Sequence, residues 1–153
     1  MLAQMLAPAA VLAAWTLVIM FWIIPARFGA LAKLEDKSAL PTGKGLRGGD
    51  LDPHLPAKAT WPAHNYAHLH EQPTVFFAIV IILALVGPTG IDIMLAWAYT
   101  GLRIVHSLWQ ILVNKIPVRF LLFLLSSLAL DGLAVRAVMA TVFADPSALP
   151  SSI

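Results

Sequence analysis

The chain has 153 residues, of which 59% are hydrophobic and only 12% are charged, and its formal net charge is +2. A soluble domain carries about a quarter charged residues, so this composition excludes an ordinary soluble domain and predicts an integral membrane protein surrounded by membrane lipids. The small net charge, without a basic run, excludes nucleic acid as a partner, and the lack of cysteine excludes disulfides, thiolate metal sites and a cysteine nucleophile.

Four apolar stretches are predicted to cross the membrane as helices. They cover approximately residues 5–32, 62–86, 91–113 and 117–143, and each exceeds the roughly 20 residues that a bilayer requires. No basic residue precedes the first stretch, so we expect it to remain as an anchor and not to be cleaved as a signal. The sequence therefore predicts one domain over residues 1–153, an all-α integral membrane four-helix bundle.

Residues 33–60 form the only long polar segment and, being rich in Gly and Pro, are expected to be a connecting loop. Its PTGKGLRGGD run is faintly similar to a phosphate loop. However, Gly45 stands where Ser or Thr should follow the lysine, and no strand precedes the run, so we predict no nucleotide site. Basic residues outside the spans fall in the first loop, residues 33–60, and in the third loop, which contains Lys115. This bias places those loops in the cytoplasm and both termini outside, across the inner or plasma membrane if the chain is bacterial.

Two of the predicted spans carry a polar stripe at helical spacing. Glu71 in the second span and Arg103 in the third are expected at matching depth. An isolated charge in hydrocarbon costs several kcal/mol, so we predict an ion pair between them, which either locks helix register or touches substrate. The stripes consist of His64, His68, Glu71 and Gln72 in the second span, and of Arg103, His106, Gln110 and Asn114 in the third.

The histidines admit a second interpretation. His64 and His68 are four residues apart and could chelate a metal, with Glu71 or His106 as a third ligand. No HExxH or ExxH pattern completes such a set, so we favour hydrogen bonding along the helices over a metal site.

Arg119 lies at the cytoplasmic mouth of the fourth span, close to Lys115. It could simply extend to the interface, as long basic side chains do. Alternatively, its guanidinium could stabilise an anion or a thiolate, because a fixed charge there adds to the dipole of the helix N-terminus.

Three sequence motifs, in this order, resemble those of one known family. HxxxHxxEQP covers residues 64–73, RIVHS covers 103–107 and PVR covers 117–119. Together with the four spans they are similar to the MAPEG family, the membrane-associated proteins in eicosanoid and glutathione metabolism. That family includes microsomal glutathione transferases and prostaglandin E synthase.

The resemblance implies a homotrimer that binds glutathione in a cytoplasm-facing cleft between subunits, with lipophilic substrates entering from the bilayer. The expected function is that of a glutathione-dependent transferase or peroxidase acting on lipophilic electrophiles. Arg119 would be the catalytic residue nearest the thiol. The expected pocket residues are Arg27, His64, His68, Glu71, Arg103, His106 and Gln110.

The chain also departs from the family's pattern. The second span of glutathione-using members carries arginines and an asparagine where this chain has His64, Ala67 and His68. Gln110 replaces a tyrosine, and Phe120 and Phe123 replace hydroxyl-bearing residues of the prostaglandin synthase. Because bidentate arginines recognise carboxylates best, these changes favour an alternative: a non-catalytic protein that binds a lipid or another anionic ligand between subunits.

Overall fold

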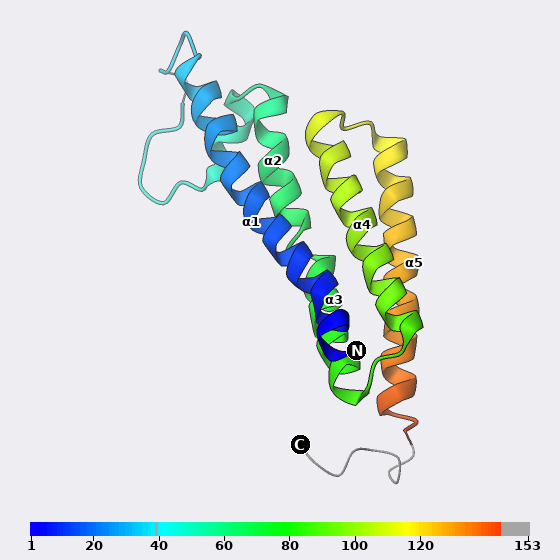
Figure 1. Ribbon diagram of the computed structural model, residues 1–153. Helices are drawn as coiled ribbons and strands as arrows, with labels where there is room; N and C mark the ends of the chain where they lie inside the picture. Colours follow the sequence, from blue (N-terminus) through cyan, green and yellow to red (C-terminus); the bar gives the residue numbers. More distant parts are fainter. Residues whose placement is uncertain (39, 145–153) are drawn as a thin grey trace.

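The computed structural model of the protein describes residues 1–38 and 40–144, and it confirms the all-α class. This part of the chain contains helices and turns and no strand (Figure 1). The elements are α1 (Leu2–Ala32), the 3-10 helix η1 (Gly48–His54), α2 (Ala57–His68), α3 (Gln72–Val86), α4 (Gly90–Leu112) and α5 (Ile116–Thr141).

The helices run up and down as an elongated bundle. Figure 1 shows α1 alongside α2 and α3, and α4 alongside α5. The C-terminal end of α1, the start of α2 and the α4–α5 turn lie at one end, and the N-terminus and the α3–α4 turn lie at the other. The first and third loops therefore share one end of the molecule. That this end faces the cytoplasm stays a prediction.

Three segments are long and apolar enough to cross a membrane, which supports an integral membrane protein. They are Leu2–Ala32, Ala57–Val86 and Ile116–Thr141. The third predicted span corresponds to α4, which is not among them. This helix carries Asp92, Arg103 and several uncharged polar side chains, and these are buried inside the bundle. Membrane crossing by α4 thus stays a prediction.

The second predicted span is interrupted. It begins at Ala57, so that the end of the expected loop is helical, and it breaks after His68 before resuming at Gln72. Pro73 explains the break, because proline has no N–H to donate and its ring would clash with the carbonyl of Leu69 four residues earlier. The chain around residues 69–71 therefore leaves the helical path in the middle of the bundle.

The loop that follows α1 is attached to that helix through Arg27. Its guanidinium donates from Nη1 to the Gly48 carbonyl at 2.7 Å and from Nη2 to Asp52 Oδ1 at 2.5 Å. A Cβ atom at position 48 would collide with the guanidinium. A side chain at this position would therefore make the Arg27 guanidinium shift away from its place against η1.

The α4–α5 turn is built on Asn114, the one described non-glycine residue with positive φ, at 54°. Asparagine tolerates this left-handed conformation better than most residues. Pro117 then lies in the first turn of α5, where its missing N–H costs no helical hydrogen bond.

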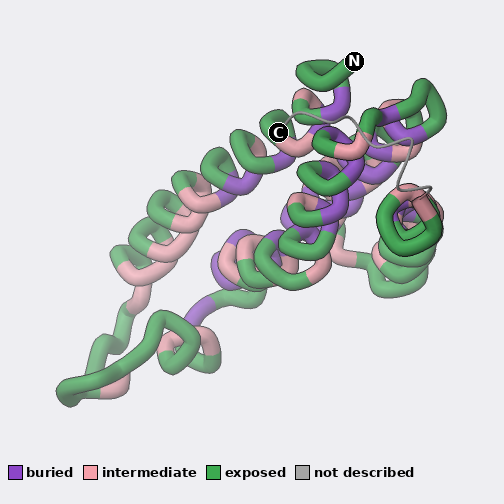
Figure 2. The backbone as a smooth tube through the Cα atoms, turned by 90° about the horizontal axis from the view of Figure 1, so that it is seen from below, coloured by how far each residue is buried: buried purple, intermediate pink, exposed green. Residues whose placement is uncertain are grey.

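The apolar core lies between the helices, while one side of α1 and much of α5 remain exposed (Figure 2). The core includes Met5, Leu12, Ile19, Phe76, Tyr99 and Leu133. Large apolar side chains along the exposed faces suit contact with lipid or with a neighbouring subunit.

Candidate functional site

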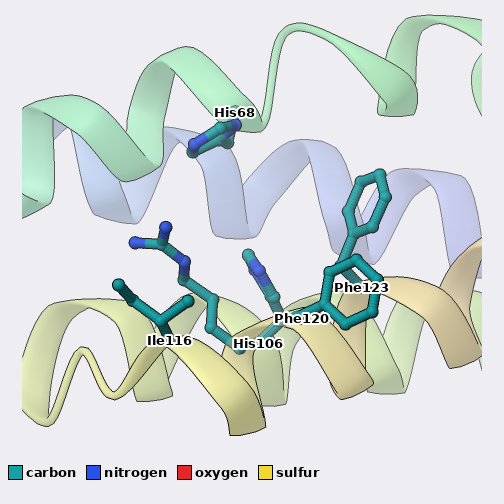
Figure 3. A pocket seen from close by; sticks show the side chains of 6 residues that line it. His68, His106, Ile116, Phe120 and Phe123 are labelled. Carbon is teal, nitrogen blue, oxygen red and sulfur yellow. The ribbon is translucent and has the colours of Figure 1, made fainter.

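A pocket of about 250 Å³ opens beside the α2–α3 break. It contains three of the residues predicted from the sequence, together with three apolar residues of α5 (Figure 3). In Figure 3, His68 approaches from one wall, and His106 and the apolar side chains form the opposite wall. The lining residues are His68, His106, Ile116, Arg119, Phe120 and Phe123.

Arg119 lies in the first turn of α5 and lines the pocket. Its Nη1 donates to Asn114 Oδ1 at 2.7 Å. The left-handed turn at Asn114 thus has a second role, because it places an amide oxygen where it orients the guanidinium. The positive end of the α5 dipole adds to the charge at this position.

His68 lies at the end of α2 and contacts Glu71 across the break. The His68 Nδ1 atom is 2.9 Å from Glu71 Oε2, and the two side chains are 45% and 65% exposed. Such a polar pair on the open side of a membrane bundle is costly unless water, a ligand or another subunit covers it. The exposed side of this pair therefore leaves room for water or for a further group beside the pocket.

The predicted ion pair between Glu71 and Arg103 is wrong. Arg103 is buried and donates from Nη2 to the His68 backbone carbonyl at 3.2 Å, and its guanidinium carbon lies 5.8 Å from the ring centroids of Tyr99 and Phe123. The break explains the difference. It turns Glu71 outward toward His68. It also deprives the His68 carbonyl of its regular helical partner, and Arg103 donates to that carbonyl instead.

Gln110 lies behind the wall of the pocket. It is buried, and its Oε1 accepts a hydrogen bond of 3.0 Å from Asn65 Nδ2. Asn65 Oδ1 accepts from Ser107 Oγ at 2.5 Å, and Ser107 accepts from Trp15 Nε1 at 3.0 Å. This network joins α1, α2 and α4 and holds the wall in place, so Gln110 is not among the pocket-lining residues.

Arg27 and His64 belong to a separate cluster at the loop end of the bundle. Both contact Asp52, whose Oδ2 is 3.0 Å from His64 Nε2. The two histidines of the metal alternative, His64 and His68, therefore contact different carboxylates. Within residues 1–38 and 40–144 no group of three potential metal ligands occurs, so the structure does not support that alternative.

Sequence reasoning missed several polar partners. Asp92 pairs with Arg136, which also donates to Thr89 Oγ1 at 2.8 Å. Matching depths could have revealed this pair, since the two residues lie equally far before and after the Asn114 turn. No such pattern in the sequence indicated the contacts of Asp52 and Asn65. Residue spacing alone predicts neither how the first loop folds nor which side of α2 faces α4.

A model of the MAPEG family matches residues 5–139. This range includes every residue of the pocket, the cluster around Asp52 and the hydrogen-bond network around Asn65. None of the curated proteins and none of the solved structures matches the chain. The match confirms the resemblance drawn from the three motifs.

Proposed function

Because the chain belongs to the MAPEG family of membrane-associated proteins in eicosanoid and glutathione metabolism, we propose that it is a glutathione-dependent transferase or peroxidase acting on lipophilic electrophiles. One observation carries the proposal. Arg119 and two histidines line the same pocket as Ile116, Phe120 and Phe123. A thiolate and a lipophilic acceptor can therefore lie side by side.

Arg119 has the chemistry for stabilising a thiolate. Its guanidinium is permanently charged, is oriented by Asn114 and lies at a helix N-terminus. A preference of about 100-fold for the thiolate over the thiol requires about 2.7 kcal/mol. In the transferase reaction the sulfur would attack the electrophilic carbon, and the leaving group would depart with its bonding electrons.

The pocket of one chain fits the thiol end of glutathione better than the whole molecule. Its volume of about 250 Å³ is below the roughly 300–1,000 Å³ usual for small-molecule sites. Arg27, one of the expected pocket residues, is already paired with Asp52. Both features support a site completed by a second copy, as in the proposed homotrimer, with exposed His68 and Glu71 at the junction.

A conjugation assay tests the proposal. Purified protein in lipid nanodiscs would be given glutathione and 1-chloro-2,4-dinitrobenzene, with release of chloride and formation of the thioether measured. We expect turnover above that of empty nanodiscs, and its loss in Arg119→Ala. Arg47→Ala, which removes an exposed loop arginine, is the matched control. Unchanged turnover in assembled Arg119→Ala would remove the proposed role.

The alternative of a non-catalytic protein that binds an anionic lipid is favoured by the same apolar surroundings of Arg119. Phe120 and Phe123 line the same pocket as the guanidinium, a combination that suits the chain and carboxylate of a fatty acid. Mass spectrometry of molecules released from the purified protein would reveal such a ligand. Its presence, together with no conjugation, would favour this function.

A further inference from the structure

A second cavity, of about 260 Å³, lies on another side of the same break, between α1 and α3. We propose that it binds a lipophilic alcohol or phenol through the ligand's hydroxyl group. Its polar lining consists of Thr16 from α1, His70 from the break and Thr74 from α3. The remaining lining residues are Ala13, Leu17, Leu69 and Phe77.

Both threonines use their only donor hydrogen inside the protein. Thr16 Oγ1 donates to the Leu12 carbonyl at 2.9 Å, and Thr74 Oγ1 donates to the Glu71 carbonyl at 2.6 Å. A hydroxyl has one hydrogen and two lone pairs. Each threonine therefore has only acceptor capacity left for a ligand.

His70 is restricted in the same way. Its Nδ1 lies 2.8 Å from the Tyr66 carbonyl oxygen, and because a carbonyl can only accept, Nδ1 must carry the proton. In the neutral ring Nε2 is then an acceptor. The His70 ring also lies against that of Tyr66, tilted by 57° with ring centroids 4.3 Å apart, and within the described residues no hydrogen bond reaches Nε2.

The three polar side chains thus present acceptors and no free donor. A carboxylate or carbonyl ligand would bring acceptor against acceptor, whereas a hydroxyl supplies the missing hydrogen. The other walls are apolar, and a cavity of about 150 Å³ is already large enough for benzene. An aromatic or cyclic alcohol therefore matches both the size and the hydrogen-bonding capacity of the cavity.

This inference is independent of the proposed glutathione chemistry. No arginine or lysine lines this cavity, so an anion has no cation to bind there. The two cavities can therefore be tested separately with different probes.

The experiment compares 2-naphthol with 2-methoxynaphthalene, which has the same rings but no donor. Each probe is titrated by fluorescence into the full-length protein in nanodiscs, with empty nanodiscs as the blank for partitioning into lipid. We expect 2-naphthol to bind about five- to tenfold more tightly after this correction, the effect of one additional hydrogen bond. Equal affinities would overturn the proposal.

His70→Phe keeps an aromatic ring and removes the acceptor, so it should abolish the preference for 2-naphthol. His54→Phe, in the exposed loop, is the matched control and should retain it. Leu17→Trp should fill the cavity and weaken both probes. If His70→Phe does not assemble, Thr16→Val removes a second acceptor at nearly constant shape and should reduce the preference. A preference that survives in assembled His70→Phe would contradict the proposal.

Discussion

The two cavities beside the α2–α3 break differ in their hydrogen-bonding capacity. The first, at His68 and Arg119, offers fixed positive charge, whereas the second, at His70 and Thr74, offers acceptors only. The chain at the break contributes a histidine to each cavity, since His68, just before it, lines the first and His70, within it, lines the second. A single interruption of a helix can thus direct neighbouring residues to two sites of opposite preference.

The backbone at the break contributes as much as the side chains. Loss of regular helix leaves the His68 carbonyl for Arg103, and the Glu71 carbonyl accepts from Thr74. Irregular backbone inside a membrane bundle is tolerated where protein groups satisfy it. The following substitutions separate the two cavities or affect both.

The largest effect is expected from Arg119→Ala. Glutathione conjugation should fall about 100-fold, because about 2.7 kcal/mol of thiolate stabilisation is removed. The 2-naphthol preference should stay unchanged, since Arg119 does not line the second cavity. Parallel activity and fluorescence measurements check this, and a change in both would show that the cavities are coupled.

Asn65→Leu should destabilise the bundle by about 2 kcal/mol, because Gln110 and Ser107 would lose their partner in a buried network. Thermal unfolding in detergent, followed by circular dichroism, measures the change. Gln4→Leu, at an exposed position of α1, is the control. Equal stability of the two variants would mean that the network does not hold the wall of the first cavity.

Pro73→Ala should affect both cavities. It should weaken the binding of glutathione in the first cavity and of 2-naphthol in the second, each by about tenfold. Alanine permits a continuous helix, in which the Gln72 N–H takes the His68 carbonyl from Arg103 and His70 turns away from Thr16. Pro53→Ala, in η1, controls for the loss of a proline. An effect confined to one cavity would contradict the common origin of the two sites.

The smallest effect is expected from Gly48→Ala. The added methyl group displaces the Arg27 guanidinium and loosens the loop, so limited proteolysis within residues 33–56 should be about fivefold faster. Gly49→Ala is the matched control, because a Cβ atom there meets nothing within 4 Å. The 2-naphthol preference should not change, and if it does, the loop contributes to the second cavity.

Much of the helical layout could be predicted from apolar length, and the bounds of α1, α4 and α5 agree within a few residues with the predicted spans. The break could have been read from Pro73, but the predicted Glu71–Arg103 pair assumed a continuous helix and was therefore wrong. His68, His106 and Arg119 belong to the larger predicted set of site residues and line one pocket, while the roles predicted for them stay predictions. Instead, Gln110 binds Asn65, and Asp52 contacts both Arg27 and His64. Spacing along a helix does not reveal which residue of a neighbouring element faces a given side chain.

Calorimetric titration of glutathione into the detergent-purified protein, beside Arg119→Ala and Arg47→Ala, tests the central claim most directly. The account predicts micromolar to millimolar binding that drops in the Arg119 variant and is retained in the Arg47 variant. No heat at several millimolar glutathione, or equal binding by all three proteins, would contradict glutathione binding at Arg119.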